Sequence, residues 1–287
     1  MKLDEGVDRQ VQQIDARDAE ALVDAGIVVL DVRTPGEYTE LGHIPGATLL
    51  PVDLSAAAPA ILDEDAPVLV TCEHAVRSRF TARVLAQAGF SKVYELSGGM
   101  ATWGGPRAFE PASIAGPSSW LLENANLLAD CRRALDVACG NGRHALLLAS
   151  AGLEVMAIDR NRAALDRLQR LAERLGLPVS VQEADLETDD PPSLVSDARP
   201  PFDLVLVTRY LHRPLFPRIT EAVAADGVLV YETFLEEQAT RGKPTNPDFL
   251  LKPGELTTLV RPLVVVRQRE GDIDGAFLSA VVARHAA

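Results

Sequence analysis

The stretch that decides the fold reads ALDVACGNG at residues 134–142, where a short apolar strand runs into a glycine-rich turn. Two glycines in that turn let the backbone approach a ligand closely, and a helix is expected to follow. A second apolar run, Leu153–Ile158, ends at Asp159, where a carboxylate can accept hydrogen bonds from both hydroxyls of a ribose. The pattern predicts an α/β sheet that binds a nucleoside-like cofactor.

Further strands are expected on the C-terminal side of this turn. Phe202–Val207 and Gly227–Thr233 are apolar runs separated by helical segments, as in a parallel sheet. The last two β-rich runs, Arg261–Arg269 and Ala276–Arg284, are joined by a hairpin-like connection. They predict an antiparallel edge on an otherwise parallel sheet.

The first third of the chain also alternates strand-like and helical segments, within a shorter length. Ile27–Val32 and Val68–Thr71 have the composition of buried strands. Asp18–Ala25 and Ser78–Ala88 carry apolar residues at helical spacing, each followed by a glycine suited to a C-terminal cap. A small α/β unit with a mostly parallel sheet is predicted.

Two domains are predicted from the chain length and from a local change in composition. A chain of 287 residues exceeds one ordinary core. Gly, Pro and Ser crowd together at 104–106 and 111–119. We therefore expect one domain at 1–108, a linker at 109–118 and a second domain at 119–287.

Composition narrows the partners and the compartment. The net charge is −13, so nucleic acid is a disfavoured partner and small molecules are favoured. Three cysteines and an N-terminus without an apolar signal core predict a reducing, cytoplasmic setting. No apolar run approaches the ~20 residues of a spanning helix, so no membrane association is expected, and no metal site is expected either. The sequence does not define the oligomeric state.

A thiol loop, CEHAVR at residues 72–77, follows the second of the early strands. A cysteine between a strand and a helix faces backbone N–H groups and a positive helix end, which favour thiolate. The amides of the loop could form a nest for an anion on sulfur, with Arg77 adding charge at its rim. The alternative is a buried structural cysteine.

The first third resembles the rhodanese family. The motifs that carry the resemblance occur in family order: Leu30–Arg33 with Glu37 and Tyr38, Gly42–Ala47, Cys72–Ser78, and Leu96–Met100 with Trp103. The resemblance implies sulfane-sulfur transfer, in which Cys72 and Arg77 are catalytic and Cys72 carries the sulfur as a persulfide. The other members of the sulfur loop are Glu73, His74, Ala75 and Val76. Related phosphatases have a longer loop, and the tighter ring here suits sulfur.

The loop departs from the family pattern in its composition. It lacks the usual central glycine and further basic residues, and it contains Glu73. A carboxylate there opposes an anionic donor such as thiosulfate, which favours a persulfide as donor. Asp31 and His43 are expected to be structural.

The glycine turn lacks the third glycine of dinucleotide-binding loops, which favours a cofactor without phosphates. This half resembles class I S-adenosylmethionine-dependent methyltransferases of the tellurite-resistance and thiopurine methyltransferase-like branch, with a Rossmann-like fold. The matching segments are Leu135–His144, Ala157–Arg160, Ala184–Leu186, Phe202–Val205 and Gly227–Glu232. The resemblance implies S-adenosylmethionine as cofactor, bound by Asp136, Ala138, Cys139, Gly140, Gly142, Asp159, Arg160, Asp185, Leu186 and Thr208. The turn would face the amino acid part, Asp159 the ribose, and Asp185 with Leu186 the adenine.

The methyl acceptor is expected at the segment after the Phe202–Val207 strand, because ligands of open α/β sheets bind at the carboxyl edge. The candidate substrate residues are Arg209, Tyr210, His212 and Arg213. A capping role in solvent is the expectation for at least two of the three basic side chains among them. Tyr231–Phe234 and Thr245–Glu255 are expected to form a lid.

These observations predict a fused enzyme, a methyltransferase with sulfurtransferase activity. Its partners would be a sulfur donor and a small methyl acceptor, for which a thiol or sulfide is expected. Two alternatives stay open. One is thiolation and methylation of a tRNA base, and the other is a regulatory rhodanese module in which Cys72 is a redox switch.

Overall fold

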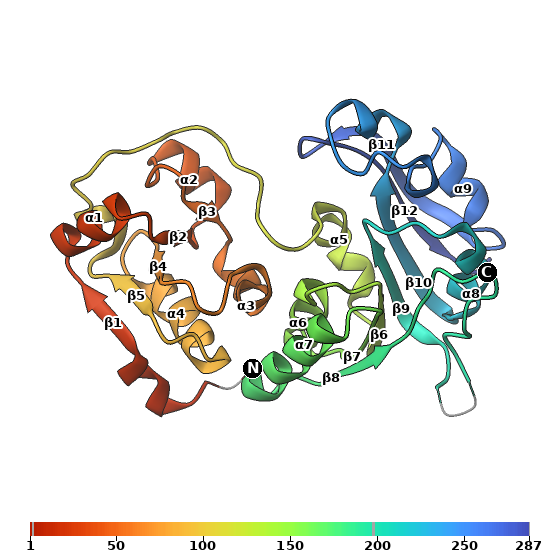
Figure 1. Ribbon diagram of the computed structural model, residues 1–287, viewed down its shortest axis with the longest axis horizontal. Coiled ribbons are helices and arrows are strands. Elements are labelled where there is room, and N and C mark those ends of the chain that lie inside the picture. Colours follow the sequence, from red (N-terminus) through yellow and green to blue (C-terminus); the bar gives the residue numbers. More distant parts are fainter. Residues whose placement is uncertain (2, 197–198, 287) are drawn as a thin grey trace. The chain divides into compact units, whose positions relative to one another are not determined.

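The computed structural model describes residues 1, 3–196 and 199–286 (Figure 1). Its internal contacts divide the chain into two compact units. The first unit comprises Met1–Pro117 and Arg167–Leu177, and the second comprises Ser118–Asp166 and Pro178–Ala287.

The first unit contains a sheet of five parallel strands in the order β1-β5-β4-β2-β3. The strands are β1 (Val11–Ile14), β2 (Val28–Asp31), β3 (Thr48–Leu49), β4 (Val68–Thr71) and β5 (Val93–Leu96). All four residues of β4 are buried, as expected for a central strand covered on both faces. The predicted small parallel α/β unit is confirmed.

Short helices connect these strands. They are η1 (Glu5–Gln10), α1 (Ala16–Asp24), α2 (Pro35–Glu40), η2 (Val52–Ala57), α3 (Ala58–Ile61), α4 (Val76–Ala88) and η3 (Gly99–Thr102). Helix α4 begins two residues before the predicted start and ends at Gly89, whose φ of 107° closes the helix. A separate core cluster joins Ala19 of α1 and Tyr38 of α2 to Leu69 and Trp103.

The second unit contains a seven-stranded sheet in the order β11-β12-β10-β9-β6-β7-β8. The strands are β6 (Arg133–Val137), β7 (Glu154–Asp159), β8 (Val179–Glu183), β9 (Phe202–Thr208), β10 (Val223–Phe234), β11 (Val264–Ile273) and β12 (Ala276–Arg284). Strands β6 to β10 pair in parallel, and β11 and β12 form the antiparallel edge. The predicted fold class is confirmed. Strand β8 was not predicted, because only its first residue, Val179, is buried and the strand leaves a weak apolar signal.

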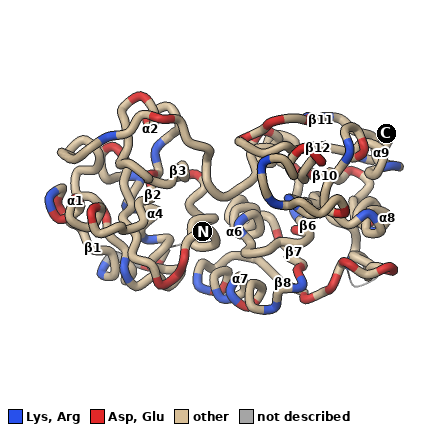
Figure 2. Tube along the Cα trace, turned by 45° about the horizontal axis from the view of Figure 1, so that its top comes forward, with Lys and Arg blue, Asp and Glu red and all other residues tan. Residues whose placement is uncertain are grey.

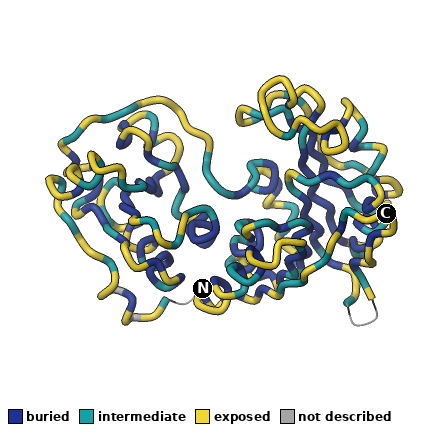
Figure 3. Tube along the Cα trace, viewed as in Figure 1, coloured by how far each residue is buried: buried dark blue, intermediate teal, exposed yellow. Residues whose placement is uncertain are grey.

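The helices of this part of the chain are α5 (Ser119–Glu123), η4 (Ala125–Leu128), α6 (Arg143–Ser150), α7 (Arg162–Leu175), η5 (Arg213–Leu215), α8 (Phe216–Glu221), η6 (Glu236–Thr240), η7 (Pro247–Phe249) and α9 (Glu255–Leu259). The main core of the unit packs the central strands against α8 and α9. Figure 3 shows these strands as the most continuously buried part of the unit. The buried strands hold the loops at their carboxyl ends in fixed positions.

Acidic and basic residues are interspersed along both units (Figure 2). Among the described helices, none combines the length and the apolar character needed to cross a membrane. Within the same residues, no group of three His, Cys, Asp or Glu side chains is arranged to hold a metal ion.

Candidate active sites

The thiol loop connects the end of β4 to the start of α4. Cys72 directly follows β4 and is 1% exposed, and Ala75 turns the chain into the helix with a φ of 59°. The Ser78 amide donates to Cys72 Sγ at 3.2 Å, and the thiol lies 3.3 Å from the Ser78 hydroxyl. That hydroxyl donates to the buried carboxylate of Glu95 at 3.1 Å. The sulfur is therefore held by a hydrogen-bond chain that ends in a negative charge.

The carbonyl groups at the start of the loop are hydrogen-bonded within the protein, whereas its amides are not hydrogen-bonded to any described residue. The Cys72 and Glu73 carbonyls accept hydrogen bonds from the amides of Met100 (2.8 Å) and Ala101 (3.1 Å). Gly99 permits this approach, since a Cβ there would lie 2.3 Å from the Cys72 oxygen. Within residues 3–196 and 199–286, no acceptor takes a hydrogen bond from the amides of residues 73–77. Those amides are free to bind an anion.

A buried ion cluster supports the loop from below. Arg33 is fully buried and bonds Asp31 through Nε and Nη2, at 3.0 and 2.7 Å. Its Nη1 donates to Glu73 at 2.8 Å. Glu73 is thus bound to a cation, although one guanidinium serves two carboxylates. His43 stacks on Tyr38 at 3.6 Å and lies 3.0 Å from its carbonyl oxygen, in keeping with the structural role expected for it.

Arg77 does not offer free charge to the loop. Its guanidinium forms two hydrogen bonds to the Glu37 carboxylate, at 2.7 and 2.5 Å. The hydrogen bond from Arg77 lowers the pKa of Glu37 to about 2. His74 and Val76 are exposed at the loop surface. The side chains therefore offer less free positive charge at the rim of the loop than the sequence predicts. Glu95 was not predicted, and its only signal in the sequence is a charged residue within an apolar strand.

The glycine turn of the second unit connects β6 to α6. Three of its residues have left-handed backbones, Ala138 (φ 55°), Gly140 (φ 55°) and Gly142 (φ 78°). The Gly140 amide donates to Asp159 at 2.8 Å, so the carboxylate at the end of β7 fixes the turn. A Cβ on Gly140 would meet nothing within 4 Å. The turn therefore presents open backbone to a ligand.

Asp136 is a buried carboxyl group in β6 that lies near the Arg143 side chain and the Ala145 amide. It is 1% exposed, and neither of its oxygens has a hydrogen-bond partner among the described residues. Burial raises its pKa to about 7, and the charge of Arg143 opposes that rise. Such a group favours a cationic ligand. The neighbouring Cys139 thiol has a pKa raised by burial, which makes it a poor nucleophile.

A cavity of about 220 Å³ adjoins the turn. Its lining residues are Ala138, Asp159, Arg160, Ala184, Leu186, Glu187, Arg209 and Tyr210. Four of the ten expected cofactor residues are among them, whereas six are not: Asp136, Cys139, Gly140, Gly142, Asp185 and Thr208. Asp185 is exposed and accepts a hydrogen bond from the Glu187 amide. The cavity is lined by Ala184 and Leu186, the residues on either side of it. Thr208 lies 3.4 Å from His144, whose pKa burial lowers to about 3.

A larger cavity of about 600 Å³ shares Arg160, Glu187, Arg209 and Tyr210 with the first. Its other lining residues are Leu211, Phe234, Lys243, Pro244, Thr245, Asn246 and Phe249. The expected lid segments contribute to this wall, whereas Lys243 was not predicted. Two expected substrate residues do not line it. His212 lies 3.0 Å from the Thr188 carbonyl oxygen, and Arg213 pairs with Glu255 at 2.7 Å.

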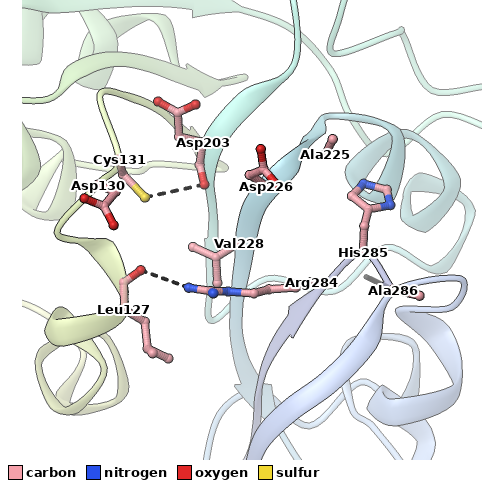
Figure 4. A pocket seen from close by; sticks show the side chains of 10 residues that line it. All are labelled: Leu127, Asp130, Cys131, Asp203, Ala225, Asp226, Val228, Arg284, His285 and Ala286. Atoms are coloured by element: carbon pink, nitrogen blue, oxygen red, sulfur yellow. Dashed lines mark hydrogen bonds between the residues drawn. The ribbon is translucent and has the colours of Figure 1, made fainter.

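A third cavity, of about 950 Å³, lies away from both cavities at the amino ends of the parallel strands, near Asp203 and Val228 (Figure 4). In Figure 4 the Cys131 thiol points to the Asp203 carbonyl oxygen at 3.5 Å, and Arg284 reaches the Leu127 carbonyl oxygen. Burial raises the pKa of Cys131. Ligands of open α/β sheets bind at the opposite edge, so this cavity is not the cofactor site.

Comparison with known protein families gives one match for the segment that contains each turn. A family model described as a rhodanese-like domain matches residues 14–105, and one described as a methyltransferase domain matches residues 134–226. Thiosulfate sulfurtransferase GlpE of Pseudomonas fluorescens is 37% identical over 106 residues, which are 37% of this chain and 94% of that enzyme. The GlpE of Pseudomonas paraeruginosa is 41% identical over 108 residues, covering 36% and 91%.

Two solved structures resemble the second unit in fold. TehB from Haemophilus influenzae has a TM-score of 0.49 at 17% identity, covering 59% of this chain and 63% of that one. A TehB-like SAM-dependent methyltransferase from Corynebacterium glutamicum has a TM-score of 0.44 at 18% identity, covering 60% and 90%.

Gly99→Ala is expected to collapse the thiol loop. The added Cβ would overlap two carbonyl oxygens, and φ at Gly99 is 65°, so we expect a loss of about 2 kcal/mol in the free energy of unfolding. Urea denaturation followed by circular dichroism measures it. Gly36→Ala is the matched control, because a Cβ at Gly36 meets nothing within 4 Å. Equal stability of the two variants would contradict the packing of Gly99 against the loop.

Proposed function

The chain belongs to the rhodanese family through its first unit and carries a methyltransferase domain in its second, and on that premise we propose a bifunctional enzyme. In this proposal Cys72 transfers sulfane sulfur, and the second unit methylates a small acceptor with S-adenosylmethionine. The observation that carries the proposal is the pair of strand-to-helix turns. One leaves five consecutive amides without an acceptor within the described chain beside a thiol, and the other leaves a buried carboxyl group unbonded.

Sulfur transfer would proceed by two displacements on sulfur. The Cys72 thiolate attacks the outer sulfur of a persulfide donor, the donor's S–S bond breaks, and the donor leaves as a thiolate. Cys72 then carries a persulfide, whose terminal sulfur an acceptor thiolate removes. The amides of residues 73–77 have no acceptor among the described residues and would be available to stabilise that anionic sulfur. A persulfide donor fits better than thiosulfate, because Arg33 and Arg77 are already paired with Glu73 and Glu37 and offer no free positive charge to a compact dianion.

The residues of the second turn fit S-adenosylmethionine. The unbonded Asp136 carboxyl would accept the ammonium group of the cofactor, and the open backbone at Gly140 would admit its amino acid part. Asp159 uses its oxygens for the Gly140 and Asn161 amides, at 2.8 Å each. Each oxygen keeps a second lone pair for a ribose hydroxyl. Leu186 offers an apolar wall to the adenine.

Methyl transfer would depend on alignment within the shared cavities. The bound cofactor supplies an electrophilic methyl group on a sulfonium. The chain then needs to hold an acceptor lone pair in line with that carbon and to exclude water. Arg209 and Tyr210 line both cavities and so would contact both cofactor and acceptor. A thiol or sulfide is the acceptor we propose, because its thiolate form needs no general base.

Cys72→Ser is expected to abolish sulfur transfer while leaving methyl transfer intact. A serine hydroxyl cannot form a persulfide, and we expect a loss of at least about 10³-fold in transfer from glutathione persulfide to cyanide. S-adenosylhomocysteine production is measured in parallel. Cys131→Ser is the control, since Cys131 lies at the opposite edge of the second sheet. Retained sulfur transfer in Cys72→Ser would refute the persulfide assignment. Methylation kinetics that change with oxidants would favour the regulatory alternative.

Asp136→Asn is expected to remove a pH dependence from cofactor binding. Because the pKa of Asp136 is raised to about 7, the carboxyl is mostly protonated at pH 6 and ionised at pH 8. Only the ionised form attracts the ammonium group. The ratio of wild-type to variant affinity should therefore rise by about tenfold over that range, measured by titration calorimetry.

Comparing the two proteins cancels the titration of the ligand itself. Asp226→Asn, at the opposite sheet edge, should keep a ratio near one at every pH. A wild-type to Asp136→Asn ratio independent of pH would show that the carboxyl does not meet the ammonium group.

A further inference from the structure

The larger cavity of the second unit carries more information about the acceptor than the fold does. Its volume of about 600 Å³ lies within the range of sites for drug-sized ligands, and it is far larger than a single sulfide ion needs. It shares four lining residues with the smaller cofactor cavity. A ligand in the larger cavity can therefore reach a group bound in the smaller one, and the volume suits an organic molecule.

The charges around this cavity are unbalanced. Of its three cations, Arg160 is paired with Glu187 at 2.6 Å. Arg209 and Lys243 have no carboxylate within 4.0 Å in the described part of the chain. Unpaired cations at a cavity wall favour an anionic ligand.

Arg209 is held in place against a backbone penalty. Its φ of 53° is left-handed, which costs a residue with a Cβ about 1 kcal/mol or more. Its amide donates to the Glu232 carbonyl at 2.7 Å, and its guanidinium lies 5.9 Å from the Phe234 ring centre. Strand β10 thus fixes the orientation of this side chain at the boundary of the two cavities.

The remaining wall suits an apolar body with one hydrogen-bond acceptor. Phe234, Phe249, Leu211 and Pro244 contribute apolar surface. The Tyr210 hydroxyl is buried and has no hydrogen-bond partner among the described residues. Burial raises the pKa of Tyr210, so the hydroxyl stays protonated and can donate a hydrogen bond to a ligand.

We infer that the methyl acceptor is an organic thiol that also bears a carboxylate, with the carboxylate against Lys243 and the apolar body against Phe234 and Phe249. The inference rests on the proposed methyl transfer and specifies its substrate class. The thiol first loses its proton to solvent. The thiolate lone pair then forms the new S–C bond, and the methyl–sulfonium bond breaks with its electron pair moving to the cofactor sulfur. The products are a thioether and neutral-sulfur S-adenosylhomocysteine.

Lys243 separates this assignment from an alternative. Arg209 lines both cavities and could instead hold the carboxylate of the cofactor, whereas Lys243 lines only the larger one. A change at Lys243 should therefore alter the KM for the acceptor and leave the KM for S-adenosylmethionine unchanged.

The experiment compares 4-mercaptobenzoate with its neutral isostere 4-mercaptobenzamide, and with sodium sulfide, as acceptors for the full chain. S-adenosylhomocysteine formation is followed by mass spectrometry. In the wild type we expect kcat/KM for the benzoate to exceed that for the benzamide by about tenfold. Lys243→Met should bring the ratio near one through KM for the benzoate, and Lys243→Arg should retain the preference. Lys252→Met is the control, because Lys252 is exposed in the same loop and lines neither cavity.

The outcomes separate a failure of the proposed acceptor class from a failure of the proposed methyl transfer. Equal use of benzoate and benzamide by the wild type, or use of sulfide alone, overturns the acceptor class while methyl transfer stands. A Lys243→Met variant with a raised KM for S-adenosylmethionine assigns Lys243 to the cofactor and also overturns it. No S-adenosylhomocysteine from any thiol, with the cofactor bound, overturns the proposed function itself.

Discussion

Both sites depend on one constraint, which is that a buried parallel strand must turn into a helix within a few residues. The turn requires left-handed backbones, found at Ala75 in one unit and at Ala138, Gly140 and Gly142 in the other. Two of these four positions are alanines, for which the conformation costs about 1 kcal/mol or more. Packed strands on one side and helices on the other hold the turns in this state. Amides that would otherwise bond within a helix are left to bind ligands.

The two units manage charge in opposite ways. Around the thiol, the cations are already paired, Arg33 with Asp31 and Glu73, and Arg77 with Glu37. In the proposed sulfur transfer, stabilisation of an anionic sulfur would therefore fall to backbone amides, which carry no net charge and suit a compact group. Around the methyl-transfer cavities, Arg209 and Lys243 lack carboxylate partners within the described chain. Unpaired side chains at a roomy cavity suit a larger anion.

Much of the fold follows from local sequence. The runs at Val68–Thr71 and Phe202–Val207 predicted β4 and β9 to within one residue, because apolar strands are read without knowledge of their neighbours. The antiparallel pair at the edge of the second sheet was also predicted, with β12 at its exact bounds, but β11 starts three residues and ends four residues later than the predicted Arg261–Arg269. Strand β8 escaped, since it is a half-buried strand whose pairing with β7 decides its conformation. The turns of both sites were also visible, because glycine spacing and the position of a cysteine after a strand are local features.

The sequence by itself determined where the chain turns and which residues follow each strand, because those properties arise from neighbours in the chain. Only the tertiary structure decided what each polar side chain meets. Arg77 and Glu37 are 40 residues apart and form an ion pair, so the expected free charge at the thiol loop is neutralised. Glu95 is linked to the sulfur by the Ser78 hydroxyl. Lys243 lines a cavity whose wall combines segments far apart in the sequence. These contacts depend on how separate strands and loops pack, and packing over such distances leaves no local pattern in the sequence.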